Sequence, residues 1–84
     1  MTQRLAQVAG FLSRNADFMA FAAIVSERAG VPYTDAAGFI RTTCEVGSRR
    51  DLDTNPEAAR RFHTIRRTFV EWRDQRQQQQ RRAA

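Results

Sequence analysis

The feature that most constrains the fold of this chain is a row of apolar side chains in its last third. They recur at steps of four, three, four and three residues: Ala58, Phe62, Ile65, Phe69 and Trp72. This spacing is typical of the narrow apolar face of an α-helix that packs against one or two partner helices. The preceding residues carry a helix-start signal, with Asn55 as N-cap and Pro56 at the first helical position, or alternatively a Thr54/Glu57 capping box. Both interpretations predict a long helix from about residue 56 to the high 70s.

Three shorter helices are predicted before this one. Thr2, Asn15 and Thr34 are placed to cap their amino termini, because short polar side chains accept hydrogen bonds from the first free backbone N–H groups. Gly30 is placed to end the second helix and Gly47 to end the third. Since no run of residues alternates between apolar and polar, the sequence predicts no strand.

One short helical turn and a polar tail complete the predicted organisation. Ser48-Arg49-Arg50-Asp51 has the form of a capping box and predicts a turn near residues 49–53. We therefore expect an all-α fold, a compact bundle of four main helices with a short extra helical turn, in which the longest helix is C-terminal. Residues 1–74 are expected to form a single helical domain. Residues 75–84, QRQQQQRRAA, have no apolar face, so they are predicted to be a Gln/Arg-rich tail that is frayed or disordered.

Length and composition limit the class of protein. A chain of 84 residues supplies one domain at most. Its single cysteine, Cys44, cannot form an internal disulfide, which fits a reducing compartment. No stretch reaches the roughly 18 apolar residues of a membrane span, and the amino terminus lacks the apolar run of a signal peptide. We therefore expect a cytoplasmic protein without a membrane partner.

The basic residues are all arginines, and they are distributed unevenly. The chain has 14 arginines and no lysine. In residues 1–48 four arginines are balanced by four acids, whereas residues 49–84 hold ten arginines and five acids, so the net charge of +5 lies in the C-terminal part. A GC-rich coding preference explains the choice of arginine over lysine but not its position. Because arginine binds phosphate or carboxylate through two parallel N–H groups, this distribution predicts an anionic partner.

The arginines of the last helix can be placed by projecting it at about 100° per residue. Two i,i+4 ion pairs are predicted, Glu57 with Arg61 and Arg67 with Glu71. The surface predicted to bind nucleic acid or another anionic partner combines arginines on the outer face and flank of this helix with two that precede it: Arg49, Arg50, Arg60, Arg66, Arg67 and Arg73. The alternative is a solvated helix face without a partner.

A second candidate for DNA binding lies at the corner predicted within residues 25–40. Small Ser26 stands where two helices must approach closely, Gly30 stands at the turn, and apolar residues stand at Val25, Val31, Ala36 and Phe39. This pattern resembles the helix-turn-helix of bacterial repressors, and the resemblance implies that these four residues are buried. In that family the second helix reads bases in the major groove with its first turn. Here Asp35 at the start of that helix repels phosphate, and the next outward residues are alanine and glycine, which carry no donors for base edges. An ordinary helical corner with a glycine turn shows the same pattern.

A longer segment resembles a type of phage gene product. Its quoted residues are Phe39-Ile40-Arg41, Cys44-Glu45-Val46-Gly47-Ser48-Arg49, Leu52-Asp53, Ala58-Ala59, Phe62-His63, Phe69 and Trp72. Over roughly residues 36–73 the chain is similar to small accessory proteins of temperate phages and prophages. The resemblance implies a phage-encoded protein that acts by binding DNA or by occupying a host protein, and it carries over no catalytic or binding residue.

The expected function is binding without catalysis. One histidine and one cysteine on different helices are too few for a zinc site, and the four glycines are dispersed rather than gathered in a phosphate-binding loop. We therefore expect no enzyme activity, no cofactor and no metal. The first hypothesis is that the arginine-rich C-terminal helix binds nucleic acid. The alternative is a phage-encoded inhibitor or adaptor that binds an acidic host protein, such as a defence or regulatory factor.

The apolar seam of the last helix also offers a surface for self-association. Phe62, Ile65, Phe69 and Trp72 would pair two copies of the chain into a homodimer if their own chain left them uncovered. Packing into the core of one chain is the alternative, because an apolar stripe on a helix commonly faces the core of its own domain. The two hypotheses differ in whether these side chains are exposed or buried within one chain.

Overall fold

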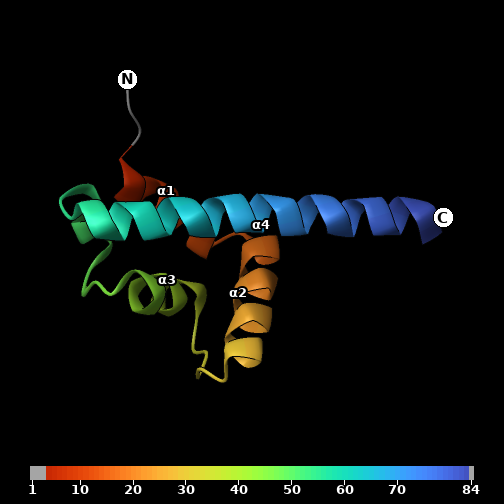
Figure 1. Cartoon of the computed structure of the whole chain (residues 1–84), viewed down its shortest axis with the longest axis horizontal. Coiled ribbons are helices and arrows are strands. Elements are labelled where there is room, and N and C mark those ends of the chain that lie inside the picture. The colour runs from red at the N-terminus through yellow and green to blue at the C-terminus, as the bar shows by residue number, and fades with distance from the viewer. Residues whose placement is uncertain (1–3, 84) are drawn as a thin grey trace.

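The structure is a computed structural model that describes the backbone of residues 4–83 and the side chains of residues 4–81. In chain order it contains α1 (Leu5–Ser13), α2 (Ala16–Ala29), α3 (Ala36–Cys44), a short 3-10 helix η1 (Arg49–Asp53) and α4 (Pro56–Ala83) (Figure 1). The predicted all-α fold is confirmed, with four helices, one short extra turn and the longest helix at the C-terminus. The Thr2 cap predicted for the first helix lies outside the described residues.

Helix α4 forms the long axis of the molecule. Its 28 residues account for about 42 Å at 1.5 Å per residue, close to the longest extent of 44 Å. In Figure 1, α2 stands across the middle of α4, α3 lies beside α2, and α1 lies behind the amino-terminal half of α4. The carboxyl-terminal part of α4 extends past the other three helices, and its side chains from residue 74 to residue 81 are exposed. Residues 75–83 therefore continue the helix past the high 70s, where the sequence predicted its end.

The junction between α1 and α2 is a tight corner of 88°. Asn15 begins α2 as predicted, because its side-chain oxygen accepts a hydrogen bond of 3.0 Å from the N–H of Phe18. Within residues 4–83, no single helix has the length and apolar content needed to cross a membrane. Only α1 and α2 taken together, across this corner, reach those values.

Two further predicted helix boundaries are confirmed. Gly30 ends α2 at φ +70°, a left-handed conformation that glycine adopts at little cost. Asn55 begins α4, since its side-chain oxygen accepts hydrogen bonds from the N–H groups of Glu57 at 3.0 Å and Ala58 at 3.2 Å. Pro56 is the first helical residue. Of the two interpretations of this segment, the structure adopts the Asn55 cap.

Two predicted helix starts differ in detail from the structure. Asp35, and not Thr34, caps α3, because its carboxylate accepts a hydrogen bond of 2.6 Å from the N–H of Gly38. A carboxylate also interacts favourably with the partial positive charge at a helix amino terminus. The turn η1 forms where the Ser48-x-x-Asp51 signal predicts it, but Ser48 makes no side-chain cap hydrogen bond.

The predicted end of the third helix at Gly47 is wrong. The structure ends α3 at Glu45, which takes the left-handed conformation at φ 57°. The N–H of Val46 donates a hydrogen bond of 3.0 Å to the carbonyl of Arg41, while the Val46 side chain packs against the core. This helix-ending pattern, with a half-buried apolar residue that packs against the core, offsets the steric cost of a left-handed residue that is not glycine.

Asp53 links η1 to the start of α1. Its two carboxylate oxygens accept hydrogen bonds from the N–H of Leu5 at 2.7 Å and the N–H of Ala6 at 3.2 Å. The first N–H groups of a helix have no partner within the helix, so a carboxylate from elsewhere in the chain satisfies them. This contact holds η1 beside the amino terminus of α1.

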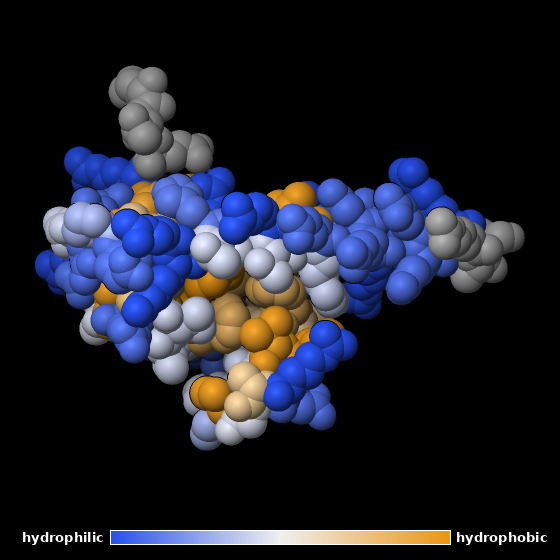
Figure 2. Space-filling view, viewed as in Figure 1, coloured by the Kyte–Doolittle hydropathy of each residue, from blue (hydrophilic) through white to orange (hydrophobic). Residues whose placement is uncertain are grey.

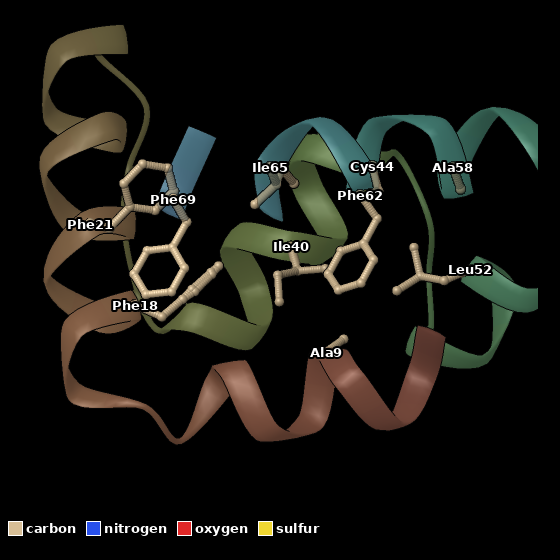
Figure 3. Packing of buried hydrophobic residues seen from close by; sticks show 10 residues of the cluster. All are labelled: Ala9, Phe18, Phe21, Ile40, Cys44, Leu52, Ala58, Phe62, Ile65 and Phe69. Carbon is tan, nitrogen blue, oxygen red and sulfur yellow. The ribbon is translucent and has the colours of Figure 1, made fainter. Parts of the chain in front are cut away.

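One hydrophobic core joins all five elements. It contains ten buried residues, Ala9, Phe18, Phe21, Ile40, Cys44, Leu52, Ala58, Phe62, Ile65 and Phe69 (Figure 3). At one end Phe18 and Phe21 of α2 meet Phe69 of α4, with ring centroids 5.2 Å and 5.5 Å from that of Phe69. At the other end the ring of Phe62 lies between Ile40 and Leu52 (Figure 3).

The apolar seam of α4 packs within the chain. Phe62, Ile65 and Phe69 are 0%, 7% and 3% exposed, and Trp72 is half-buried with its ring centroid 5.7 Å from that of Phe21. Three of the four side chains predicted to join two copies are therefore enclosed by their own core. Phe62, Ile65 and Phe69 therefore pack in the core of their own chain, as the second of the two hypotheses predicts. No continuous apolar seam of α4 is exposed for self-association in the described residues.

Candidate nucleic-acid interface

Three arginines of α4 lie over aromatic rings of the same helix. The pairs are Arg66 with Phe62, Arg73 with Phe69 and Arg76 with Trp72, and the guanidinium carbons lie 6.0, 5.5 and 5.2 Å from the ring centroids. In each pair the arginine follows its aromatic partner by four residues, so the two side chains share one side of the helix. Arg66, Arg73 and Arg76 are called the arginine row below.

The core restricts where these guanidinium groups can lie. Phe62 and Phe69 are buried and Trp72 is half-buried, so the rings under the arginine row are held by packing. A guanidinium that lies against an aromatic ring is attracted to its face and keeps N–H groups available for hydrogen bonds to an anion. The arginine row therefore presents three cations that are partly ordered before any partner binds.

The arginine row runs along the axis of α4. The ten helical steps from Arg66 to Arg76 cover about 15 Å at 1.5 Å per residue. Measured along the axis of duplex DNA, each strand places one phosphate about every 3.4 Å, so the row covers the axial length of about four phosphates of one strand. One acid lies beside it, with Asp74 Oδ1 3.9 Å from Arg73 Nε, and this pair is exposed enough for water and salt to weaken it.

Two other arginines of α4 are largely balanced by acids. Arg60 Nη1 lies 3.4 Å from Glu57 Oε2, and Arg61 Nε lies 3.5 Å from Glu57 Oε1. Arg61 also donates a hydrogen bond to Glu45, which raises the pKa of its guanidinium above the usual range. The predicted Glu57–Arg61 pair is present. The Arg60–Glu57 pair was not predicted, because the sequence analysis left Arg60 without an acidic partner.

Arg67 lies near the arginine row but not within it. Its side chain is exposed and lines a shallow hollow with His63 on the outer face of α4. The Arg67–Glu71 ion pair predicted from the sequence is not among the ion pairs formed by the described side chains. Arg67 therefore adds a solvent-facing cation on the neighbouring face of the helix.

Arg49 and Arg50 do not continue the arginine row. Both lie on η1, and the side chain of Arg49 crosses to α1, where it lines a hollow together with Phe11 and Arg14. The six arginines predicted to form one surface are thus divided between α1 with η1, the outer face of α4, and the arginine row itself. Only two of the six belong to the arginine row.

Arg76 belongs to the arginine row although the predicted set omits it. The sequence does hold a signal for it, because Arg76 follows Trp72 by the same four residues that separate the other two pairs. The Gln/Arg-rich composition of residues 75–84 obscured this spacing. The last arginine of the row thus stands in the segment that the sequence predicted to be a frayed or disordered tail.

An apolar groove lies on the other flank of α4. It consists of two adjoining hollows of about 390 and 340 Å³ that share Val25, Phe39 and Thr43. The first lies between α2 and α3, and the second reaches α4, where Arg60 and Arg61 line it together with Thr64, Ile65 and Thr68. Figure 2 shows hydrophobic surface gathered beneath α4 in the angle between α3 and α2. The molecule thus carries an arginine-rich flank and an apolar flank on the same helix.

The corner between α2 and α3 is the segment that resembles a helix-turn-helix. Its two helices are joined by six residues, 30–35, whereas the turn of that motif has about three or four. Asp35 uses its carboxylate to cap α3, and the hydroxyl of Tyr33 lies 3.5 Å from the carbonyl of Met19. The first turn of α3 therefore presents an acid and no arginine. Val31, which the resemblance places in a buried position, is 44% exposed because it lies in this longer connection.

Cys44 and His63 lie in different environments. Cys44 is buried in the core, and burial raises the pKa of its thiol, while the nearby Arg61 lowers that pKa by less. His63 is exposed on α4. A buried, protonated thiol is a poor nucleophile. Within the part of the chain that the structure describes, no group of three histidine, cysteine or acidic side chains is placed to hold a metal ion.

Comparison of the chain with protein-family models, with curated proteins and with solved structures finds no match.

Proposed function

We propose that this protein binds nucleic acid without catalysing a reaction, and that the contact is made by the arginine row of α4. The observation that carries the proposal is the placement of three successive guanidinium groups over aromatic rings along one side of a single helix. Phosphate oxygens are the anions that such N–H groups bind through paired hydrogen bonds. Arg67 and Arg81, both exposed, add positive charge along the same helix.

The charge distribution favours a phosphate backbone over a single small anion. The cations extend along a helix rather than converging on a pocket, and the net charge of the chain is +5. Each phosphate that a cation neutralises releases bound counterions, and this release supplies binding energy that does not depend on sequence. Backbone contacts of this type position a protein on nucleic acid without reading bases.

The direct test is a fluorescence anisotropy titration of a short labelled DNA duplex at about 50 mM salt. The variant Arg66→Gln/Arg73→Gln/Arg76→Gln removes the arginine row, and Arg28→Gln/Arg41→Gln/Arg60→Gln removes the same charge elsewhere. Because hydrogen bonds to charged groups contribute about 1.5–3 kcal/mol each, we expect the first variant to weaken binding by at least about 100-fold. The second is expected to weaken it far less. Equal losses in the two variants, or no binding by the wild type, would overturn the proposal.

A second candidate function is binding of a host protein, as the resemblance to phage accessory proteins implies. The observation that favours it is the apolar groove, in which Val25, Phe39 and Ile65 line a continuous depression. The fitting occupant is an amphipathic helix whose apolar face enters the groove and whose acidic residues face this positively charged chain. Such a contact is compatible with a nucleic-acid interface on the opposite flank of α4.

The two functions can be separated by two variants tested in parallel. Thr43 is exposed and lines both hollows, so Thr43→Arg fills the groove without disturbing the core. In pull-downs from nuclease-treated host lysate, a groove partner is expected to be lost with Thr43→Arg and retained with the arginine-row variant. The reverse is expected for duplex DNA. A captured protein that tolerates Thr43→Arg would count against the groove.

A further inference from the structure

A second cationic site lies on the outer face of α1, away from the arginine row. Phe11 is 69% exposed there, the highest exposure among the large hydrophobic side chains of the described residues. It borders an open hollow of about 340 Å³ whose lining is Ala6, Gln7, Gly10, Phe11, Arg14 and Arg49. This set is called the Phe11 hollow below. An isolated exposed phenylalanine is ordinary, but one that shares a hollow with two arginines is not.

Glycine at position 10 lets Arg49 reach this hollow. A Cβ atom on Gly10 would lie only 2.5 Å from Arg49 Nη1, so the guanidinium rests directly against the backbone of α1. The Asp53 carboxylate, bonded to the N–H groups of Leu5 and Ala6, holds η1 against α1 at the amino-terminal end of that helix. Arg49 thereby lines the same hollow as Arg14, which precedes it by 35 residues in the sequence.

Neither arginine of the Phe11 hollow is neutralised by an acid. Among the ion pairs formed by the described side chains, none includes Arg14 or Arg49. Two uncompensated guanidinium groups that line one hollow create a positive potential that favours an anion there. The ring of Phe11 offers an apolar face at the edge of the same depression. The site thus combines one surface for stacking with two groups for a negative charge.

We propose that the Phe11 hollow binds an unpaired base together with its phosphate, so that the nucleic acid recognised by this protein includes a single-stranded stretch. The base stacks on Phe11, and Arg14 and Arg49 contact the phosphate. Aromatic side chains stack with any base because every base has a flat π-face, and arginines beside them follow the backbone. Bases inside a duplex are already stacked on one another, so this site selects single-stranded over duplex regions. The inference rests on the proposed function and specifies the class of nucleic acid.

Two substitutions test the two parts of the site, the aromatic ring and the guanidinium of Arg49. Phe11→Ala removes the stacking surface, and Met19→Ala is the matched control, because Met19 is also an exposed hydrophobic residue but lies on α2 outside the hollow. Gly10→Ala displaces the Arg49 guanidinium while leaving both arginines in the chain. Since alanine favours a helix more than glycine and the displaced atom is the end of a flexible side chain, Gly10→Ala is expected to fold.

The measurement is anisotropy of labelled oligothymidylate and of a labelled duplex of equal length. We expect Phe11→Ala to weaken oligothymidylate binding about tenfold, Gly10→Ala to weaken it as well, and Met19→Ala to leave it unchanged. Duplex affinity, which depends on the arginine row, is expected to change less than twofold in all three variants. Thymidine 5′-phosphate is expected to compete only weakly.

Each contrary result points to a different error. If Phe11→Ala leaves oligothymidylate binding unchanged while the wild type still binds duplex through the arginine row, the inference fails and the proposed function stands. If the wild type binds neither probe, both fail. If thymidine 5′-phosphate binds as tightly as the oligonucleotide, the hollow is a mononucleotide site and the single-strand assignment is overturned.

Discussion

Two residues end helices in the left-handed conformation, Gly30 at φ +70° and Glu45 at φ 57°. Glycine adopts this conformation without steric cost, whereas other residues lose about 1–2 kcal/mol. Glu45 is held there because Val46 packs against the core and the Glu45 carboxylate accepts a hydrogen bond from Arg61. A glycine in the sequence is thus an incomplete signal, since Gly30 ends a helix and Gly47 does not.

Replacement of Gly30 tests this difference. Nothing lies within 4 Å of a Cβ atom added at Gly30, so Gly30→Ala acts only through its backbone conformation. We expect it to lower the free energy of unfolding by about 1 kcal/mol in urea denaturation followed by circular dichroism. Gly47→Ala is the control, because Gly47 also has open space but no positive φ, and its effect is expected to stay within about 0.5 kcal/mol. Equal effects would contradict the assignment of the helix ends.

The buried thiol of Cys44 gives the stability of the protein a dependence on alkaline pH. Burial raises the pKa of this thiol above 9.0, and Arg61 lowers it by less, so the unfolded chain loses the proton at lower pH than the folded chain does. The resulting stability is complete below the pKa of the unfolded thiol and is lost as pH rises through the folded pKa. We expect the free energy of unfolding to fall above about pH 9 more steeply in the wild type than in Cys44→Ala. Parallel pH profiles would contradict this.

At the scale of elements, local signals predicted most of the helices and distant contacts decided the rest. The spacing of Phe62, Ile65 and Phe69 predicted α4 and the side of it that is buried, because helix periodicity and caps are properties of neighbouring residues. Asp53 contacts Leu5 and Ala6 at the start of α1, and these partners lie 48 and 47 positions away from it in the sequence. No local sequence pattern encodes a contact over that separation. The same holds for the approach of Arg49 to Gly10.

The contact between η1 and α1 is testable by removing its carboxylate. Asp53→Ala leaves the N–H groups of Leu5 and Ala6 without their acceptor, so we expect the free energy of unfolding to fall by about 1–2 kcal/mol, as for loss of a helix cap. Asp51→Ala in the same turn is the control, since no side-chain hydrogen bond of Asp51 is formed with the described residues. A larger effect of Asp51→Ala than of Asp53→Ala in urea denaturation would show that this cap does not hold α1.

At the scale of the whole molecule, α4 separates two different surfaces. One flank carries the arginine row over rings anchored in the core, and the other borders the apolar groove between α2 and α3. The sequence predicted that the positive charge belongs to the C-terminal helix, because charge balance can be counted along the chain. Which arginines are neutralised was not predictable in full, since Arg61 is bonded to Glu45 from a different segment. The groove, likewise, exists only after three helices have packed together.

The central claim, that the arginine row neutralises phosphates, is tested most directly by the salt dependence of duplex binding. Each neutralised phosphate contributes about −0.9 to the slope of the logarithm of the association constant against the logarithm of the salt concentration. Replacing Arg66, Arg73 and Arg76 together with glutamine is therefore expected to make the slope shallower by about 2.7. The control variant lacking Arg28, Arg41 and Arg60 is expected to keep a slope close to that of the wild type. An unchanged slope in the arginine-row variant would contradict the claim.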